Sequence, residues 1–216
     1  MREAREATGY ARQQAEAAAS QARTAQQEFE LSERPWVSAK PIGIAQPLTF
    51  GSDGKGRLEI AVRFENVGAS VAVSFYEWAD IFALGTLYDP SFALKRQAEW
   101  CKGNEFPRYP GHSNVAGKVL FPHDPITETM GMALTSDQVA KAVSEPSIPS
   151  VPTKIAAVIA GCLVYRAPFD SKDTPNQQTK FMYELASEGG SMPLFVPTGT
   201  PPNLSLYLAW VGNSAQ

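Results

Sequence analysis

Two cysteines and two histidines are the residues of this 216-residue chain whose chemistry could most directly define a site. Cys101 and Cys162 lie too far apart for a CxxC redox motif and fit no zinc-binding spacing. If they pair, the bond closes a long loop and stabilises the fold by roughly 4 kcal/mol in the chain-entropy model. A buried free thiol at Cys162, within an apolar segment, is equally ordinary. The sequence leaves both states open, and pairing would indicate an oxidising compartment.

The histidines give little indication of a metal or catalytic site. His112 and His123 each stand near a proline in an expected loop, and neither belongs to a zinc motif such as HExxH. The chain also lacks the GxSxG motif of a nucleophilic serine. We therefore expect solvated histidines, no metal, no cofactor and no catalytic residues.

A polar loop is the second candidate site. It contains Phe169, Asp170, Asp173 and Asn176 between two apolar segments. Its oxygen atoms lack the ligand order of a known calcium-binding loop, so side chains that simply face water are the default interpretation. In the alternative interpretation, exposed aromatic rings such as Phe169 or Tyr109 combine with this loop to bind a small ligand or a carbohydrate.

Composition divides the chain into two parts. Lysine and arginine number 19 against 22 acidic residues, a net charge of −3, so no basic surface for nucleic acid is expected. Residues 1–34 are rich in alanine, arginine and glutamate, whereas all 17 prolines and all 4 tryptophans follow them. We interpret 1–34 as a helical stalk and 35–216 as a β domain.

The stalk is expected to be one helix from Arg2 to Glu33, because strong helix formers fill it and no proline interrupts it. It should end there because Pro35 disfavours helical dihedrals at Arg34. Its apolar residues form a heptad seam: Ala4, Ala11, Ala18 and Ala25 in one row, and Ala15, Ala22 and Phe29 in the other. Three interpretations remain open: a solvated spacer held by pairs such as Arg12 and Glu16, a self-associating coiled coil, or a helix docked on the β domain.

Beyond Pro35 the apolar pattern changes to the two-residue period of β-strands. The expected strands are 47–50, 58–65, 71–84, 118–121, 126–134, 154–166, 178–185 and 204–211, and the expected short helices are 91–102 and 136–144, with Ser136 as an N-cap. The order lacks regular β–α alternation, so the sequence predicts a mainly β, antiparallel sandwich with two short helical insertions after one long helix.

Two further expectations concern single residues. Asn66 and Gly68 should end a strand, because both residue types tolerate positive φ. The tryptophans Trp36, Trp78, Trp100 and Trp210 should anchor the core rather than form a ligand platform.

Five short segments carry a resemblance to a known group: 33–37 (ERPWV), 65–68 (ENVG), 120–122 (LFP), 161–165 (GCLVY) and 180–183 (KFMY). They resemble uncharacterised bacterial membrane-anchored proteins in which a transmembrane helix precedes an Ala/Gln/Arg-rich stalk and an Ig-like β-rich extracytoplasmic domain. The resemblance implies an Ig-like sandwich and supplies no catalytic residues.

The chain departs from that pattern because it begins inside the stalk. Its longest apolar run, 155–165, is about half of the roughly 20 residues that a spanning helix needs. Either an anchor upstream of Met1 was removed, or the start was assigned late, or the anchor was lost. Location is accordingly cytoplasmic as the chain is written, or the periplasmic face of the inner membrane if an upstream anchor exists.

The combined expectation is a non-enzymatic interaction module of the cell envelope, a β-sandwich displayed on a helical stalk that works through protein partners. Self-association through the stalk is a further expectation, and membrane contact would come only through a segment upstream of Met1. The alternative is a small-ligand or carbohydrate-binding sandwich. A hydrolase ranks third and would require His112 or His123 beside a carboxylate in a deep pocket.

Overall fold

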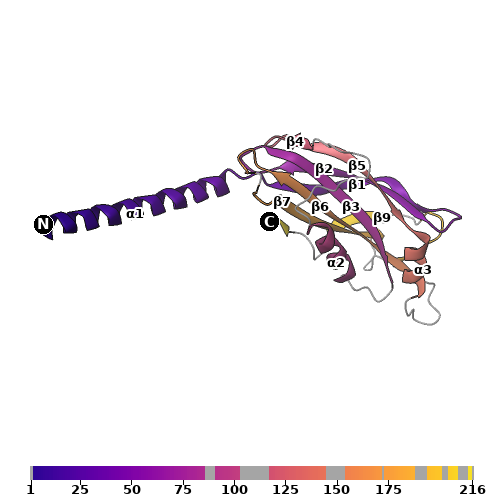
Figure 1. The fold of residues 1–216 in the computed structure, drawn as a ribbon. Helices are drawn as coiled ribbons and strands as arrows, with labels where there is room; N and C mark the ends of the chain where they lie inside the picture. Colours follow the sequence, from indigo (N-terminus) through magenta and orange to yellow (C-terminus); the bar gives the residue numbers. More distant parts are fainter. Residues whose placement is uncertain are drawn as a thin grey trace.

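The computed structural model describes residues 2–85, 91–102, 117–144, 154–171, 173–187, 194–200, 204–208 and 214–215. A single long helix, α1 (Arg2–Ser32), leads into a domain made mainly of antiparallel β-sheet (Figure 1). The helix points away from the domain, and every side chain from Gly9 to Ser32 is exposed. In this chain α1 therefore does not dock on the β domain.

The first sheet has three strands in the order β1 (Val37–Phe50), β2 (Gly56–Asn66) and β5 (Ile126–Leu134). Its first two strands form the expected hairpin around a glycine-rich turn, in which Gly54 adopts a φ of 72°. A Gly is suited to this position because it carries no Cβ that would oppose the left-handed conformation. The turn is therefore a structural connection rather than a phosphate-binding loop.

The second sheet is larger. Its main path runs β10 (Ser214–Ala215), β7 (Gln177–Ser187), β6 (Ile155–Arg166), β3 (Ala72–Leu84) and β4 (Lys118–Leu120). Two short strands join this path, β8 (Leu194–Phe195) beside β6 and β9 (Leu204–Leu208) beside β7. All strand pairings in both sheets are antiparallel, as the missing β–α alternation predicted.

Strand β6 organises two apolar layers because its two faces are both buried. Alternate residues such as Ile159 and Leu163 join a cluster that also contains Ile60 and Phe64 of the first sheet. The intervening residues, including Val158 and Ala160, belong to a second cluster on the opposite face. This double burial explains why the sequence of β6 is almost continuously apolar.

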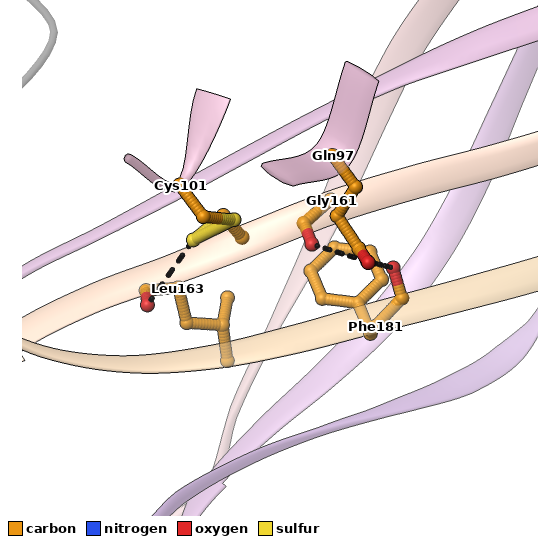
Figure 2. The surroundings of a disulfide bond; sticks show 6 residues. Gln97, Cys101, Gly161, Leu163 and Phe181 are labelled. Carbon is orange, nitrogen blue, oxygen red and sulfur yellow. Dashed lines mark hydrogen bonds between the residues drawn. A yellow bond between two sulfur atoms is a disulfide. The ribbon is translucent and has the colours of Figure 1, made fainter. Parts of the chain in front are cut away.

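Helix α2 (Ser91–Trp100) covers that opposite face. The disulfide between Cys101 and Cys162 ties its carboxyl end to β6, with the two Cα atoms 5.9 Å apart (Figure 2). Beside the bond, the buried Gln97 amide donates to the carbonyls of Gly161 at 3.2 Å and Phe181 at 2.7 Å (Figure 2). A covalent bond and two buried hydrogen bonds therefore hold α2 in place.

Helix α3 (Ser136–Ser144) packs Val139 and Ala142 into the core shared by the sheets. The expected N-cap at Ser136 is wrong, because Thr135 takes that role. The Thr135 hydroxyl accepts from the Gln138 backbone at 3.2 Å, and the Gln138 side chain accepts from the Thr135 backbone at 2.8 Å. This reciprocal pair is a capping box, and its Thr-x-x-Gln spacing was present in the sequence.

Strand β1 starts ten residues before the expected Pro47, at Val37. Prolines misled the prediction, since Pro41 and Pro47 both lie within the strand. They are tolerated because β1 is the edge of its sheet, and register shifts after Pro41 and around Gln46 show where the ladder is irregular. An edge position and bulges thus allow a proline-containing strand of 14 residues.

The remaining expectations are confirmed for most strands and helices and corrected for one tryptophan. The remaining segments that lie among the described residues form the strands and helices predicted for them. Trp36 is not a core anchor, since 42% of its surface is exposed. His112, Tyr109 and residues 209–211, which include Trp210, lie outside the described residues, as does the side chain of Trp100.

Removal of the disulfide is the first test of this arrangement. The double variant Cys101→Ser/Cys162→Ser should lose up to about 4 kcal/mol of unfolding free energy, because the unfolded chain regains the freedom of a long loop. Urea unfolding without reductant measures the difference. Adding a reductant should destabilise the wild-type protein and leave the variant unchanged. If the wild type and the variant are equally stable without reductant, the prediction is contradicted.

Candidate functional site

The joint between α1 and the β domain is built around the side chain of Asn66, which is completely buried at the end of β2. Its Oδ1 accepts from the backbone N–H groups of Trp36 at 3.1 Å and Gly68 at 3.0 Å. Its Nδ2 donates to the carbonyls of Ser70 at 2.7 Å and Leu120 at 3.1 Å. All four hydrogen-bonding positions of the amide are therefore used, and they join three backbone segments: the linker before β1, the turn after β2 and the end of β4.

Gly68 completes the joint because it lets the linker before β1 pass close to the turn that follows β2. A Cβ at Gly68 would lie 2.5 Å from the backbone nitrogen of Trp36 and 2.8 Å from the carbonyl carbon of Pro35, so only glycine fits. Strand β2 ends at Asn66, as predicted, although neither Asn66 nor Gly68 is among the positive-φ residues of the described chain. The glycine is required for space, and the asparagine is required for its amide.

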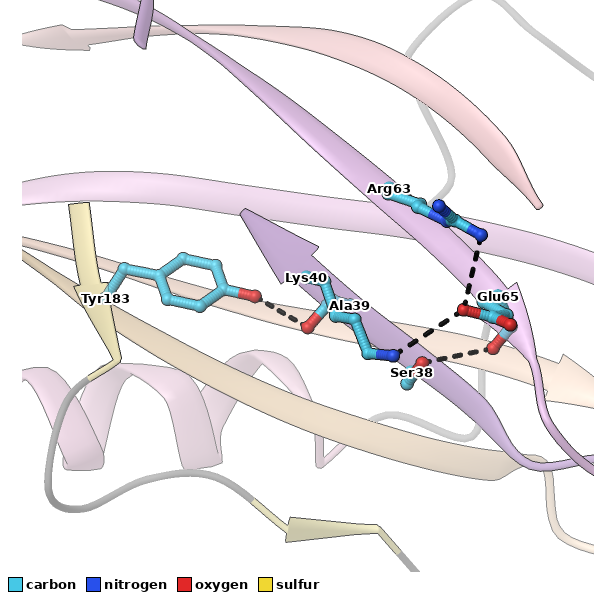
Figure 3. Close-up of polar contacts among 6 residues, drawn as sticks. All are labelled: Ser38, Ala39, Lys40, Arg63, Glu65 and Tyr183. Atoms are coloured by element: carbon cyan, nitrogen blue, oxygen red, sulfur yellow. Dashed lines mark hydrogen bonds and ion pairs between the residues drawn. The ribbon is translucent and has the colours of Figure 1, made fainter. Parts of the chain in front are cut away.

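Three side chains of the second sheet hold the start of β1. The Tyr165 hydroxyl accepts from the Val37 backbone at 3.3 Å, and the Thr179 hydroxyl donates to the Val37 carbonyl at 2.6 Å. The Tyr183 hydroxyl donates to the Ala39 carbonyl at 2.8 Å (Figure 3). The edge strand that continues from the stalk is thus fastened to both sheets, and burial raises the pKa of Tyr183 above its ordinary value.

Surface charges add a second, weaker set of contacts along the hairpin of β1 and β2. Glu65 lies 3.6 Å from the Lys40 ammonium and 3.7 Å from the Arg63 guanidinium, while the Ser38 hydroxyl donates to the Glu65 carbonyl (Figure 3). The cations are about half exposed or more, so each pair contributes at most about 1 kcal/mol.

A three-residue ion cluster connects the two sheets on the side of β4. The ammonium of Lys118 on β4 pairs with Glu77 of β3 and with Glu128 of β5, which belongs to the other sheet. Desolvation raises the pKa of Glu77, with the nearby Glu128 adding to the rise and Lys118 opposing it. The two carboxylates in turn raise the pKa of Lys118, against the effect of its own desolvation.

The short segments quoted for the family resemblance meet at this joint. Trp36, Asn66 and Leu120 are linked by the Asn66 amide, and Asn66 also forms a bridge with Pro122. Tyr165 and Tyr183 bind the first residues of β1. Segments distant in the sequence therefore share one structural task, which is to attach the stalk to the domain.

A solvent-open cavity of about 530 Å³ lies next to this joint, and its walls come from three elements. The linker before β1 supplies Arg34, the end of α2 and the turn after it supply Ala98, Cys101 and Lys102, and the β6–β7 hairpin supplies the rest. Its full lining is Arg34, Ala98, Cys101, Lys102, Thr174, Pro175, Asn176, Gln177, Gln178 and Lys180. Its size is typical of small-molecule sites.

Only one residue of the predicted ligand loop lines this cavity, namely Asn176. Asp170 accepts from the Ala167 backbone at 2.7 Å and so closes its own turn. Phe169 is 47% exposed and Asp173 is exposed, and neither lines the cavity. The cations Arg34, Lys102 and Lys180 were not singled out from the sequence, because they are dispersed along the chain without a recognisable spacing.

Of the two histidines, His123 is the one that lies among the described residues. His123 is exposed at a turn with a φ of 60°, and no hydrogen bond or ion pair of its ring is present there. The same part of the chain holds no group of three or more His, Cys, Asp or Glu residues that could bind a metal ion.

Comparisons with known proteins add no assignment: no protein-family model, no curated protein and no solved structure matches the chain. Within the described residues, α1 is the longest helix, and neither it nor any other helix combines the length and the apolar character needed to cross a membrane.

Asn66→Ala should lower the unfolding free energy by at least about 2 kcal/mol, because it leaves buried backbone donors and acceptors without partners. Urea unfolding gives the value. Gln46→Ala, at an exposed position of β1, is the matched control and should change stability by less than about 0.5 kcal/mol. The prediction fails if the two variants are equally stable.

Because the Tyr183 hydroxyl is buried, the unfolding free energy should decrease as the pH rises through the alkaline range. Its pKa is raised in the folded state, so the hydroxyl ionises first in the unfolded chain, near the ordinary value of 10.0. The stability that Tyr183 contributes is present below pH 10 and is lost as pH rises above it.

The variant Tyr183→Phe should be about 1 kcal/mol less stable than wild type at pH 8, through loss of the bond to Ala39. That difference should shrink between pH 9 and 11 in urea unfolding curves, because only the wild type loses stability through this group. A difference that stays constant over this interval would show that Tyr183 ionises equally in both states.

Proposed function

We propose that this protein is a non-enzymatic interaction module in which a β domain is displayed at the end of a helical stalk and acts through protein contacts. The observation that carries the proposal is the contrast along the chain around Pro35. The side chains of α1 from Gly9 to Ser32 are exposed, whereas Pro35 and Val37 are buried immediately afterwards. A helix without partners, joined firmly to a folded domain, suits a spacer or an assembly element.

We further propose that the domain is an Ig-like sandwich. The strand order supports this assignment, since β1, β2 and β5 correspond to strands A, B and E, and β3, β6 and β7 correspond to C, F and G. The disulfide differs from that of antibody domains, because it joins α2 to β6 instead of bridging strands B and F. Ig-like sandwiches serve widely as binding domains at cell surfaces, which agrees with the proposed role.

We assign the module to the cell envelope on two grounds. Disulfides persist in oxidising spaces such as the bacterial periplasm, and Cys101–Cys162 is such a bond. The resemblance to membrane-anchored stalk proteins gives the same location, the periplasmic face of the inner membrane. An anchor supplied upstream of Met1 would hold the stalk at the membrane.

The stalk is also the proposed route of self-association. Ala11, Ala18, Ala15, Ala22 and Phe29 lie in its heptad seam, and all five are exposed. An alanine seam lets two helices approach closely, but each methyl group contributes little, about 0.8 kcal/mol per buried carbon. Phe29, with 62% of its surface exposed, is the one large side chain that a second helix would cover.

The stalk proposal predicts that the full chain self-associates while the fragment 35–216 folds as a monomer. Sedimentation equilibrium at micromolar concentration, with circular dichroism to verify folding, distinguishes the two. Ala18→Lys places a charge in the seam and should weaken association at least about tenfold, because it buries an unpaired ammonium.

Ala17→Lys is the matched control, since residue 17 neighbours the seam without belonging to it. It should associate as the wild type does. A monomeric full chain, or an equal effect of the two lysines, would contradict self-association through α1 and leave the stalk as a solvated spacer.

A further inference from the structure

We propose that the cavity between Arg34, the end of α2 and the β6–β7 hairpin is a binding site for a small, multiply charged anion bearing carboxylate or phosphate groups. The inference does not depend on the function of the stalk. It rests on the charges of the lining and on a buried amide that lies on the same face of β7 as one of them. The ligand class differs from a carbohydrate, because Phe169 does not line the cavity and cations do.

Among the described residues, the lining carries three positive charges and no carboxylate. Arg34, Lys102 and Lys180 come from three different elements and line one cavity. Within the same part of the chain none of the three forms an ion pair, whereas six other cations do so. Their charges are therefore not neutralised within this part of the protein, in a chain whose net charge is −3.

The wall formed by β7 adds a buried amide to these charges. Gln178, which is 9% exposed, alternates with Lys180 along β7, so both side chains lie on the face of the strand that carries Cys162. An oxyanion in the cavity would accept from the Gln178 amide. The neighbouring Gln177, whose buried Nε2 has no hydrogen-bond partner, shares the opposite face with Thr179 and Tyr183 and is not counted as a donor to the cavity.

The carboxyl end of α2 is the unfavourable feature of the site. A helix terminus of this kind presents an effective charge of roughly −0.5. Three full positive charges outweigh it, and Lys102 lies directly after the helix, where a cation also offsets the dipole. The net field in the cavity therefore favours an anion.

The covalent framework makes the cavity a formed site. Cys101 belongs to its lining, and the disulfide to Cys162 fixes the neighbouring Lys102 relative to the sheet. Arg34 directly precedes the buried Pro35 of the stalk joint. A bound anion would thus contact the linker, α2 and β7 together.

The test is a titration of the full, oxidised chain with inorganic pyrophosphate and separately with citrate, followed by backbone and side-chain amide NMR. Sodium chloride at equal ionic strength is the reference. We expect saturable shifts at Gln178, including its side-chain amide, and at Lys102 and Lys180. A response to pyrophosphate alone identifies a phosphate ligand, a response to citrate alone identifies a carboxylate ligand, and either supports the site.

Two variants localise the binding. Lys102→Gln/Lys180→Gln should raise the dissociation constant at least about tenfold, because charged hydrogen bonds are the stronger ones. Gln178→Leu keeps the approximate size of the side chain, removes the donor and should weaken binding several-fold. The control Lys95→Gln/Lys141→Gln removes two exposed cations outside the cavity and should leave the affinity unchanged.

Three outcomes would overturn the proposal. They are the absence of saturable shifts with both anions, shifts that sodium chloride reproduces, and equal weakening by the cavity variants and the control pair. Because Gln178→Leu changes no charge, a loss of binding in that variant with an otherwise native NMR spectrum would separate a specific site from general electrostatic attraction.

Discussion

The buried amide of Asn66 is the interaction on which the arrangement of the whole chain depends. It satisfies backbone groups of the stalk linker, of the turn after β2 and of the end of β4 at one point. A hydrophobic contact could not replace it, because those backbone groups would then be buried without partners. The close approach permitted by Gly68 brings the linker within reach of the amide. The path of the linker is therefore set by hydrogen-bond geometry at one end of the domain.

Strand β6 is the second element that organises the domain, because both of its faces are packed. Its inward residues join the core between the sheets, and its outward residues meet α2. The disulfide and the Gln97 hydrogen bonds both act on that outward face. As a consequence, the cavity wall formed by Lys102 and the wall formed by β7 are positioned by the same strand. The candidate site and the core are coupled through β6.

Local sequence patterns predicted much of the fold, because the order of apolar and polar residues in a strand reflects which of its faces are buried. The two-residue alternation of β2 and the continuous apolar run of β6 both reflect which faces are covered. The failures share a different cause. Pro41 lies in a strand because that strand is an edge, and Gly68 is needed because Pro35 and Trp36, distant in the sequence, pass close to it, so neither requirement is visible locally. The cavity was missed for the same reason, since Arg34, Lys102 and Lys180 meet only through tertiary structure.

The firmness of the joint decides what the stalk can do. A helix of 31 residues extends about 46 Å, so a small rotation at its base becomes a large displacement at its tip. A flexible linker would allow the domain to turn freely on the stalk. Here only Glu33 and Arg34 separate α1 from the buried Pro35, and Val37 is already bonded to Tyr165 and Thr179. The orientation of the domain is thus tied to that of the helix. If two stalks pair, their domains must also adopt a defined relative orientation, and the faces bearing Arg34 would be presented in a fixed way around the stalk axis.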